Sequence, residues 1–288
     1  MKVGIGLPAV IPGASGELVM DWASRADAGP FSTLGLIDRV IYSNYEPMVT
    51  LAAAAGATCR IRLMTSVLLV PLRSAVLLAK EAASLNELSG GRFTLGLGVG
   101  GRIVKEDFNA VGASFHDRGK RMDDILRTMR RIWAGEVPPG GSEPVGPPIS
   151  KGEPEVLIGG YRPVALRRAA RWGDGFLAAP ATPRDTQAQY AMVMDFWKQE
   201  GRSGQPRFVS GMYYGLGPNA AQRADDYIRH FYAFLGPAAG EIAASVRSSD
   251  KAVRDALRAF SEIGVDEMIL WPCIAELDQL DRLADLVG

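Results

Sequence analysis

Apolar residues follow two alternating patterns along the chain: short continuous runs, and longer segments with a helical repeat. The first run spans Lys2 to Leu7 and ends at Pro8, and residues 17–28 then bring their apolar positions onto one face of a helix. A short apolar run bounded by Pro or Gly is typical of a buried strand, and a repeat of three or four residues is typical of a helix with one buried face. The chain therefore begins with a strand followed by a helix.

The same alternation continues to the end of the sequence. The strand pattern recurs in eight segments, at residues 2–7, 33–37, 61–70, 93–99, 156–158, 175–178, 208–214 and 267–271. The helical pattern lies between and after them, at residues 17–28, 47–55, 73–88, 122–133, 163–172, 184–200, 221–235, 251–263 and 277–287. Eight strands, each followed by a helix, predict a (β/α)8 TIM barrel of the α/β class.

Three connections are longer than a barrel needs. The polar segment 102–117 after the fourth strand is a candidate lid or binding loop. The segment 215–250 after the seventh strand adds a helix and a run of small residues. Residues 136–154 are rich in Pro and Gly, but we interpret them as a surface loop because the strand-helix pattern resumes beyond them. We expect one domain over residues 1–288, with insertions after strands 4 and 7.

Composition removes several classes of function. The 32 basic and 32 acidic residues cancel, which gives no electrostatic case for binding nucleic acid or an anionic membrane. No apolar run reaches the roughly 20 residues of a membrane-spanning helix, and the N-terminus has the pattern of a strand and not of a signal peptide. We expect a cytoplasmic protein. With only two Cys and two His, in no metal-binding spacing, we expect no metal site and chemistry supplied by a cofactor.

The carboxyl ends of the strands are where a barrel of this type places its active site. Gly159-Gly160 ends the fifth strand just before a helix, where exposed amide hydrogens and the helix dipole favour an anion such as phosphate. A tight turn that needs positive φ explains the same residues. Arg162 either adds a cation to such a site or is a solvated charge at the start of the helix.

Residues 79–102, AKEAASLNELSGGRFTLGLGVGGR, combine the end of a helix, a stop at Ser89-Gly90-Gly91 and a strand that carries Gly96 and Gly98. Glycines in a strand mark a close approach of a ligand or of another backbone. One alternative is a dinucleotide fingerprint, with Asp117 beyond it, in an NAD(P)-dependent dehydrogenase. The spacing is not G-x-G-x-x-G, however, and three strand-helix units precede it.

This stretch closely resembles the signature of the bacterial-luciferase-like flavin or deazaflavin oxidoreductases. In that family an Ala-Lys-Glu/Gln helix, Leu-Ser-Gly-Gly-Arg and a glycine-rich fourth barrel strand occur in this order. The resemblance implies a TIM-barrel oxidoreductase or monooxygenase that uses reduced FMN with O2, or coenzyme F420 as hydride carrier, on a small organic substrate. The substrate itself is not readable, because the two insertions that would select it show the weakest resemblance.

The resemblance also assigns residues to the cofactor. The implied binding residues close the first, third, fourth and fifth strands: Leu7, Thr65, Ser66, Val67, Gly98, Gly100, Gly101, Arg102, Gly159, Gly160, Tyr161 and Arg162. Family members place a non-prolyl cis peptide in the third strand, which we predict at Ser66-Val67. From the residues alone, Thr65 and Ser66 are also explained as hydroxyls bonded locally at a strand end.

The proton-transfer residues are less well defined. Asp38 ends the second strand, where family members commonly show an Asp-His pair, but here Arg39 follows it. His116 in the 102–117 segment is a candidate substitute, and an exposed loop histidine is the alternative. The missing histidine also leaves open a flavin-binding protein without turnover. We take Asp38 and His116 as the catalytic candidates.

The resemblance further implies a homodimer, formed through helices on one side of the barrel and supplied by a separate flavin or F420 reductase. Met48, Leu51 and Leu78 lie on the corresponding helices.

Overall fold

The strands form a closed parallel barrel. The computed structural model describes the backbone of residues 1–288 and every side chain except that of Ile103. The sheet order is β3-β2-β1-β9-β8-β7-β6-β5-β4, and β3 also pairs with β5, which closes the sheet on itself. The strands are β1 (Lys2–Gly6), β2 (Thr33–Leu36), β3 (Arg62–Thr65), β4 (Leu68–Leu69), β5 (Phe93–Gly98), β6 (Glu155–Gly159), β7 (Gly175–Leu177), β8 (Arg207–Tyr214) and β9 (Glu267–Pro272). Since β3 and β4 together occupy one strand position, the barrel has eight strand positions. The predicted (β/α)8 fold is therefore confirmed.

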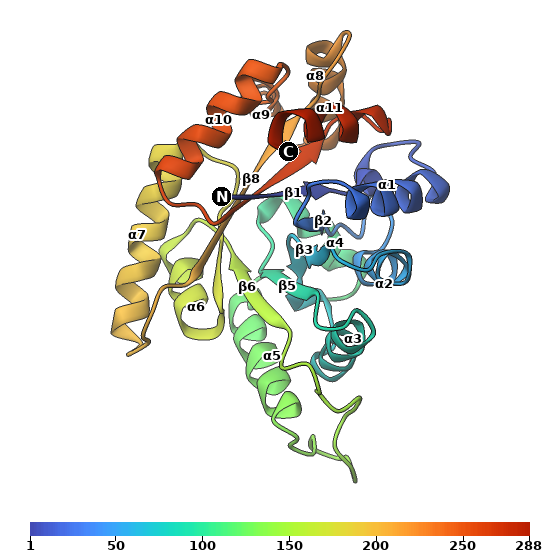
Figure 1. The fold of residues 1–288 in the computed structure, drawn as a ribbon. Helices are drawn as coiled ribbons and strands as arrows, with labels where there is room; N and C mark the ends of the chain where they lie inside the picture. The colour runs from blue at the N-terminus through green and yellow to red at the C-terminus, as the bar shows by residue number, and fades with distance from the viewer.

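Helices surround the barrel (Figure 1). They are α1 (Gly16–Ala28), α2 (Pro47–Ala57), α3 (Ala75–Leu88), α4 (Lys105–Ala110), α5 (Arg118–Trp133), α6 (Pro163–Trp172), α7 (Pro183–Gln199), α8 (Ala220–Phe231), α9 (Ala238–Ala244), α10 (Asp250–Glu262) and α11 (Asp278–Val287). Four short 3-10 turns accompany them: η1 (Pro8–Val10), η2 (Val70–Leu72), η3 (Arg102–Val104) and η4 (Ala233–Leu235). In the part of the chain that the structure describes, no helix is both long and apolar enough to span a bilayer.

The predicted third strand is not continuous. The expected run 61–70 divides into β3 and β4, with a cis peptide bond between Ser66 and Val67 as predicted. Before the break Thr65 pairs with Leu36 on β2, whereas after it Leu68 pairs with Leu97 on β5. Because Leu63 and Met64 already pair with β5, the pairing with β2 ends at this point while that with β5 continues, which a uniformly apolar run does not reveal.

The two insertions are more ordered than the sequence suggested. Residues 102–117, expected to be a polar loop, contain η3 and α4, whose Asp107 and Phe108 are fully buried. The small-residue segment after β8 forms α9. Short helices of this kind depend on tertiary contacts, which a local pattern does not show. Residues 136–154 contain no helix or strand, as expected of a surface loop.

The outer face of the barrel carries most of the core. Outward-facing residues of the strands, such as Ile5 and Leu270, pack against the buried faces of the helices. Met48, Leu51 and Leu78 belong to this layer and are at most 8% exposed, so they are not available to a second subunit. The exposed large apolar side chains on the same two helices are Val49, Val76, Leu77 and, at the far end of α3, Leu88.

The amino-terminal end of the barrel interior is polar. Arg207 forms ion pairs with Glu155 and Glu267, and Arg62 donates to Thr94 Oγ1 at 2.8 Å. Thr94 Oγ1 in turn donates to Glu155 Oε2 at 2.7 Å. Because each charged group has a partner within the ring, this end of the barrel is closed by a hydrogen-bonded network.

The middle of the barrel is filled by Trp271 of β9. A Cβ atom at Gly6 would overlap Cε3 of its indole, one at Gly35 would lie 2.8 Å from Cη2, and one at Gly211 would lie 2.7 Å from Nε1. Strands β1, β2 and β8 therefore carry glycine where they pass the ring. Val67 fills the neighbouring space in the same way, since Cβ atoms at Gly98 and Gly159 would approach its methyl groups to 2.5 and 2.6 Å.

Gly6→Ala should lower the free energy of unfolding by about 1–3 kcal/mol, because the added methyl group overpacks the space that the Trp271 indole occupies. Combining it with Trp271→Phe should cost less than the sum of the two single changes. Denaturant unfolding measures both. Gly56→Ala is the control: it adds a methyl group to α2 with no atom within 4 Å and should raise stability by about 0.5–1 kcal/mol. Wild-type stability in Gly6→Ala would contradict this packing.

Candidate functional site

The mouth of the barrel lies at the carboxyl ends of the strands, above Trp271 and Val67. The inward-facing side chains there form one cluster with residues of α8 and α9, and this cluster includes Trp271, Tyr213, Tyr227 and Cys273. Leu7, expected at the cofactor, is buried in the outer layer between strands and helices instead. Its side chain therefore contributes to the core and not to the mouth.

The segment Thr65-Ser66-Val67 lies at the edge of this mouth. Thr65 is fully buried and its Oγ1 donates to the carbonyl oxygen of Gly96 at 2.7 Å, which is the local bonding expected of a strand end. The Ser66 amide donates to the carbonyl oxygen of Leu36 at 2.7 Å. Val67 is half-buried and contributes the apolar surface described above. Of the three, Ser66 and Val67 present surface at the mouth.

The glycines after β5 accommodate side chains of this chain. The space in front of Gly98 holds Val67, and a Cβ atom at Gly100 would lie 2.8 Å from Val104 and 3.1 Å from Phe108. Gly100 also has φ of 73°, a conformation that favours glycine. Gly101 precedes η3, and Arg102 is exposed. The close approach that the sequence indicated here is thus made by Val67 and by the start of the 102–117 insertion.

The turn Gly159-Gly160 joins β6 to α6. Gly160 has φ of 150°, and a Cβ atom there would lie 2.5 Å from that of Ala165, so both conformation and packing require glycine. Arg162 is at the N-cap of α6, and no side chain among those described caps this end. Tyr161 and Arg162 are exposed. The turn explanation is therefore sufficient for the glycines, while the end of α6 stays accessible to an anion.

Asp38 is buried at the end of β2. Its Oδ2 accepts hydrogen bonds from the Leu69 amide at 2.9 Å and from Arg73 Nη2 at 3.1 Å. Burial raises the pKa of the Asp38 carboxyl, against the attraction of Arg73, which lowers it. Arg73 also pairs with Glu46 at 2.9 Å. These contacts hold the segment after β4 against the end of β2.

Arg39, which stands where the resembling family has histidine, joins three parts of the mouth. Its Nε donates to Asp107 Oδ2 at 3.2 Å, and its guanidinium lies 5.3 Å from the ring centroid of Phe234 in η4. Asp107 also accepts from the amides of Val40 and Ile41 at 2.7 and 2.6 Å. The buried Asp107 thus fastens α4 to the loop after β2, a role that its place in a polar segment did not indicate.

His116 is exposed between α4 and α5. Its neighbour Phe115 packs edge-on against Phe108, with ring centroids 5.2 Å apart, and Arg118 lies 3.9 Å over the Phe115 ring. Arg118 also donates to the carbonyl oxygen of Gly100 at 3.0 Å. The aromatic neighbour is therefore the anchored residue of this segment, while His116 itself faces solvent.

Four tyrosines, missed in the sequence, line the inner side of the mouth. We call Tyr42, Tyr213, Tyr227 and Tyr232 the tyrosine cluster. The hydroxyl oxygens of Tyr213 and Tyr232 are 2.9 Å apart, and Tyr42 and Tyr227 both pack on Phe231. Burial raises the pKa of Tyr213 and of Tyr227 well above the usual value, so both phenols are neutral donors near pH 7. The aromatic stretch 227–234 on an insertion was the available signal.

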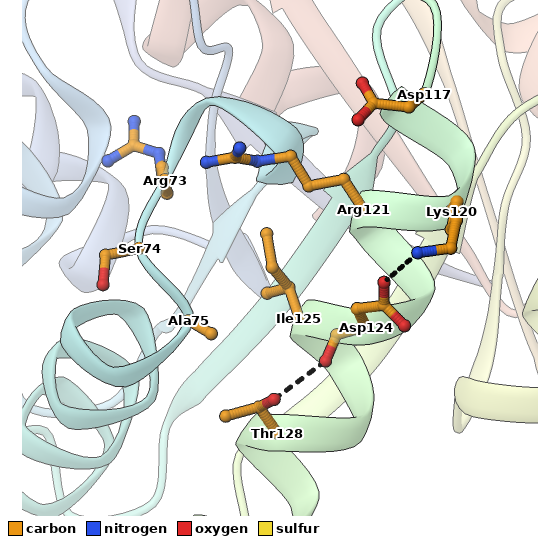
Figure 2. A pocket seen from close by; sticks show the side chains of 9 residues that line it. All are labelled: Arg73, Ser74, Ala75, Asp117, Lys120, Arg121, Asp124, Ile125 and Thr128. Atoms are coloured by element: carbon orange, nitrogen blue, oxygen red, sulfur yellow. Dashed lines mark hydrogen bonds and ion pairs between the residues drawn. The ribbon is translucent and has the colours of Figure 1, made fainter. Parts of the chain in front are cut away.

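Two surface clefts lie beside residues described above. One, of about 330 Å³, lies between α3 and α5 and has charged walls. Figure 2 shows Arg121 extending from α5 toward the side that holds Arg73, and Lys120 beside Asp124 at 3.3 Å. The other, of about 370 Å³, lies between α8 and the segment after η1 and reaches Tyr227 and Cys273. Only the second adjoins the tyrosine cluster.

Comparison with known proteins identifies the family. The family model described as luciferase-like monooxygenase matches residues 1–275, and the chain belongs to this family. An uncharacterised protein of Mycobacterium tuberculosis is 34% identical over 164 residues, which cover 55% of this chain and 56% of that relative. The match thus spans little more than half the length of the relative.

Two solved structures share the fold across nearly the whole chain. An F420-dependent secondary alcohol dehydrogenase, in complex with an F420-acetone adduct, has a TM-score of 0.81 at 14% identity and covers 100% of this chain and 99% of its own. The oxygenating constituent of 3,6-diketocamphane monooxygenase from Pseudomonas putida, in complex with FMN, has a TM-score of 0.76 at 16% identity and covers 100% and 98%. At these identities the likeness shows the fold.

Asp107→Ala should lower the free energy of unfolding by about 3 kcal/mol, because it leaves two amides and the Arg39 guanidinium without their buried acceptor. Hydrogen exchange at the Val40 and Ile41 amides should accelerate more than exchange in the barrel strands. Glu106→Ala, which changes the exposed neighbour on α4, is the control and should have little effect on either measurement. Equal exchange rates in the two variants would show that Asp107 does not fasten this loop.

Proposed function

We propose that this protein is an oxidoreductase of the luciferase-like family that uses reduced FMN with O2, or F420 as a hydride carrier, on a small organic substrate. The observation that carries the proposal is the filled barrel with an apolar floor of Trp271 and Val67 at its mouth. A planar tricyclic ring can lie against such a floor, and the family match over residues 1–275 supplies the class of cofactor.

The residues present fit both parts of the cofactor. Val67 and Trp271 offer apolar surface to the ring, with the Ser66-Val67 peptide beside it. The exposed end of α6, with Gly160 and Tyr161 before it and Arg162 at its N-cap, offers amide hydrogens and a cation to a phosphate. Arg102 is a second exposed cation after β5. When bound, the cofactor supplies the electrons, and the chain positions it and keeps the ring out of water.

The two proposed catalytic residues differ in support. Asp38 is buried at the end of β2 with a raised pKa, and its orientation is set by Leu69 and Arg73. Such a carboxyl can hold a proton at a higher pH than an exposed one. His116 is exposed, so only its residue type supports it. We propose Asp38 as the primary candidate and His116 as the second.

The two alternative functions, a nicotinamide-dependent dehydrogenase and a cofactor-binding protein without turnover, differ in their support. A dehydrogenase of doubly wound topology is excluded, because the strands close into a barrel and Gly96 to Gly101 do not lead directly into a long helix. A cofactor-binding protein without turnover remains the second proposal, supported by Arg39 at the position of the family histidine and by its structural contact to Asp107. Consumption of O2 or of an acceptor across a broad substrate panel would contradict this second proposal.

Arg102→Ala and Arg162→Ala should each weaken binding of FMN or F420 roughly tenfold, the loss of one charge-assisted hydrogen bond. Their affinity for riboflavin, which has the ring of FMN without its phosphate, should not change. Fluorescence titration with FMN, riboflavin, F420, NADH and NADPH measures this. Arg167→Ala, an exposed change further along α6, is the control. Binding of a nicotinamide nucleotide alone would contradict the proposed function.

We also propose that the protein acts as a cytoplasmic homodimer supplied with reduced cofactor by a separate reductase. The support for a dimer is the exposed apolar surface on α2 and α3, where Val49 is 70% exposed and Leu77 is 59% exposed. Surface of this kind is typical of a contact between subunits.

Leu77→Glu should shift the protein from dimer to monomer at micromolar concentration, because it places a charge in an apolar contact. Sedimentation velocity measures the change. Leu88→Glu is a matched control at the far end of the same helix, where Leu88 is also exposed. A wild-type protein that sediments as a monomer would contradict the proposed dimer.

A further inference from the structure

The tyrosine cluster has more hydroxyl hydrogens than acceptors. The hydroxyls of Tyr42 and Tyr227 are buried, and neither has a hydrogen-bond partner among the described side chains and backbone. Between Tyr213 and Tyr232 a single hydrogen bond uses one of two hydrogens, so the hydroxyl that accepts keeps its own hydrogen. Burying a hydroxyl without a partner costs stability. The cluster is therefore suited to receive an acceptor atom from a bound molecule.

The side chains that pack on the cluster are largely apolar. Aromatic rings of Phe231 and Phe234 pack on its members, and Val10, Ile11 and Cys273 belong to the same buried cluster. Arg39, whose guanidinium lies 5.8 Å from the Tyr42 ring centroid, is paired with Asp107. A charged ligand group placed among these rings would lose its hydration, whereas a neutral oxygen loses much less.

A route to the cluster is present. The cleft of about 370 Å³ between α8 and the segment after η1 is lined by Tyr227 and Cys273 on its inner side and by Arg223, Asp226 and His230 at its rim. Arg223 is paired with Glu276 at 2.5 Å, so the charge at the rim is partly neutralised. The volume is that of a site for a small organic molecule. Tyr227 thus lies between the cleft and the other hydroxyls of the cluster, with its own hydroxyl on the buried side.

We propose that the tyrosine cluster is the substrate-recognition element of this enzyme, and that it selects an uncharged, ring-containing substrate whose carbonyl or hydroxyl oxygen accepts a hydrogen bond from Tyr227. The aromatic side chains hold the ring, and the phenols hold the oxygen. This assignment rests on the proposed function, because only an enzyme has a substrate. The binding that it describes, however, does not require turnover.

Three small molecules of similar shape test which ligands the tyrosine cluster selects. 2-Acetylnaphthalene has a ring system and a neutral acceptor oxygen, 2-ethylnaphthalene lacks the oxygen, and 2-naphthoate carries a negative charge. Equilibrium dialysis against the full chain, with and without saturating cofactor, gives the affinity of each. We expect the ketone to bind roughly 3- to 10-fold more tightly than the hydrocarbon, the range of one neutral hydrogen bond, and the carboxylate to bind more weakly than both.

Tyr227→Phe removes only the hydroxyl. It should reduce the preference for the ketone over the hydrocarbon to near unity, and it should raise Tm by roughly 1–3 °C because an unpaired buried hydroxyl is lost. Tyr214→Phe is the matched control. Tyr214 follows Tyr213 at the end of β8 and is fully buried, but its hydroxyl lies 3.4 Å from the Gln279 carbonyl oxygen of α11, on the outer side of the barrel. It should leave the preference unchanged.

Several results would overturn the assignment. These are failure of the ketone to bind at its solubility limit, carboxylate binding as tight as that of the ketone, or an unchanged preference in Tyr227→Phe. A fall in Tm in that variant would show that the hydroxyl has a structural partner and would also count against it. Cofactor titration of the same proteins separates the two proposals: ketone binding without FMN or F420 binding would contradict the proposed function and leave the recognition element standing.

Discussion

The packing of the Trp271 indole inside the barrel is the constraint on which the site depends. One side chain from β9 takes the volume that inward-facing side chains of β1, β2 and β8 would otherwise fill. Those three strands therefore have glycine where they face the indole, at Gly6, Gly35 and Gly211. Because protein interiors are close-packed, the height of this ring sets the level at which the filled barrel ends. Trp271 and Val67 beside it thus form the floor of the mouth.

Each of the two charged residues that follow β2 is paired with a residue of opposite charge. Asp38 pairs with Arg73, and Arg39 pairs with Asp107. Each carboxylate also accepts hydrogen bonds from backbone amides. Asp38 accepts from Leu69, and Asp107 accepts from Val40 and Ile41. The residues that hold these loops in place therefore also neutralise each other where they are buried. In such a medium a single hydrogen bond from a phenol discriminates more strongly than it would in water.

Much of the fold was predictable because it depends on local periodicity. The buried stripe of α5 and the bounds of α6 follow from helical spacing, and the family motif at 79–102 led to the cis peptide at Ser66-Val67. The errors concern contacts between distant segments. The break between β3 and β4 and the helix α4 depend on neighbours far along the chain. The same holds for Gly98 and Gly159, which make room for Val67. The tyrosine cluster was missed because Tyr42 and Tyr213 come together only in the folded barrel.

The ion-paired ring at the amino-terminal end of the barrel, formed by Arg62, Glu155, Arg207 and Glu267, has an evolutionary consequence. It ties four strands together at the end opposite the mouth, so closure of the barrel does not rely on the residues that meet a ligand. Changes in η4, α8 and α9 can then alter what the mouth accepts at little risk to the fold. A scaffold divided in this way is free to diversify in specificity, as a lineage would need in order to reuse one cofactor site for many compounds.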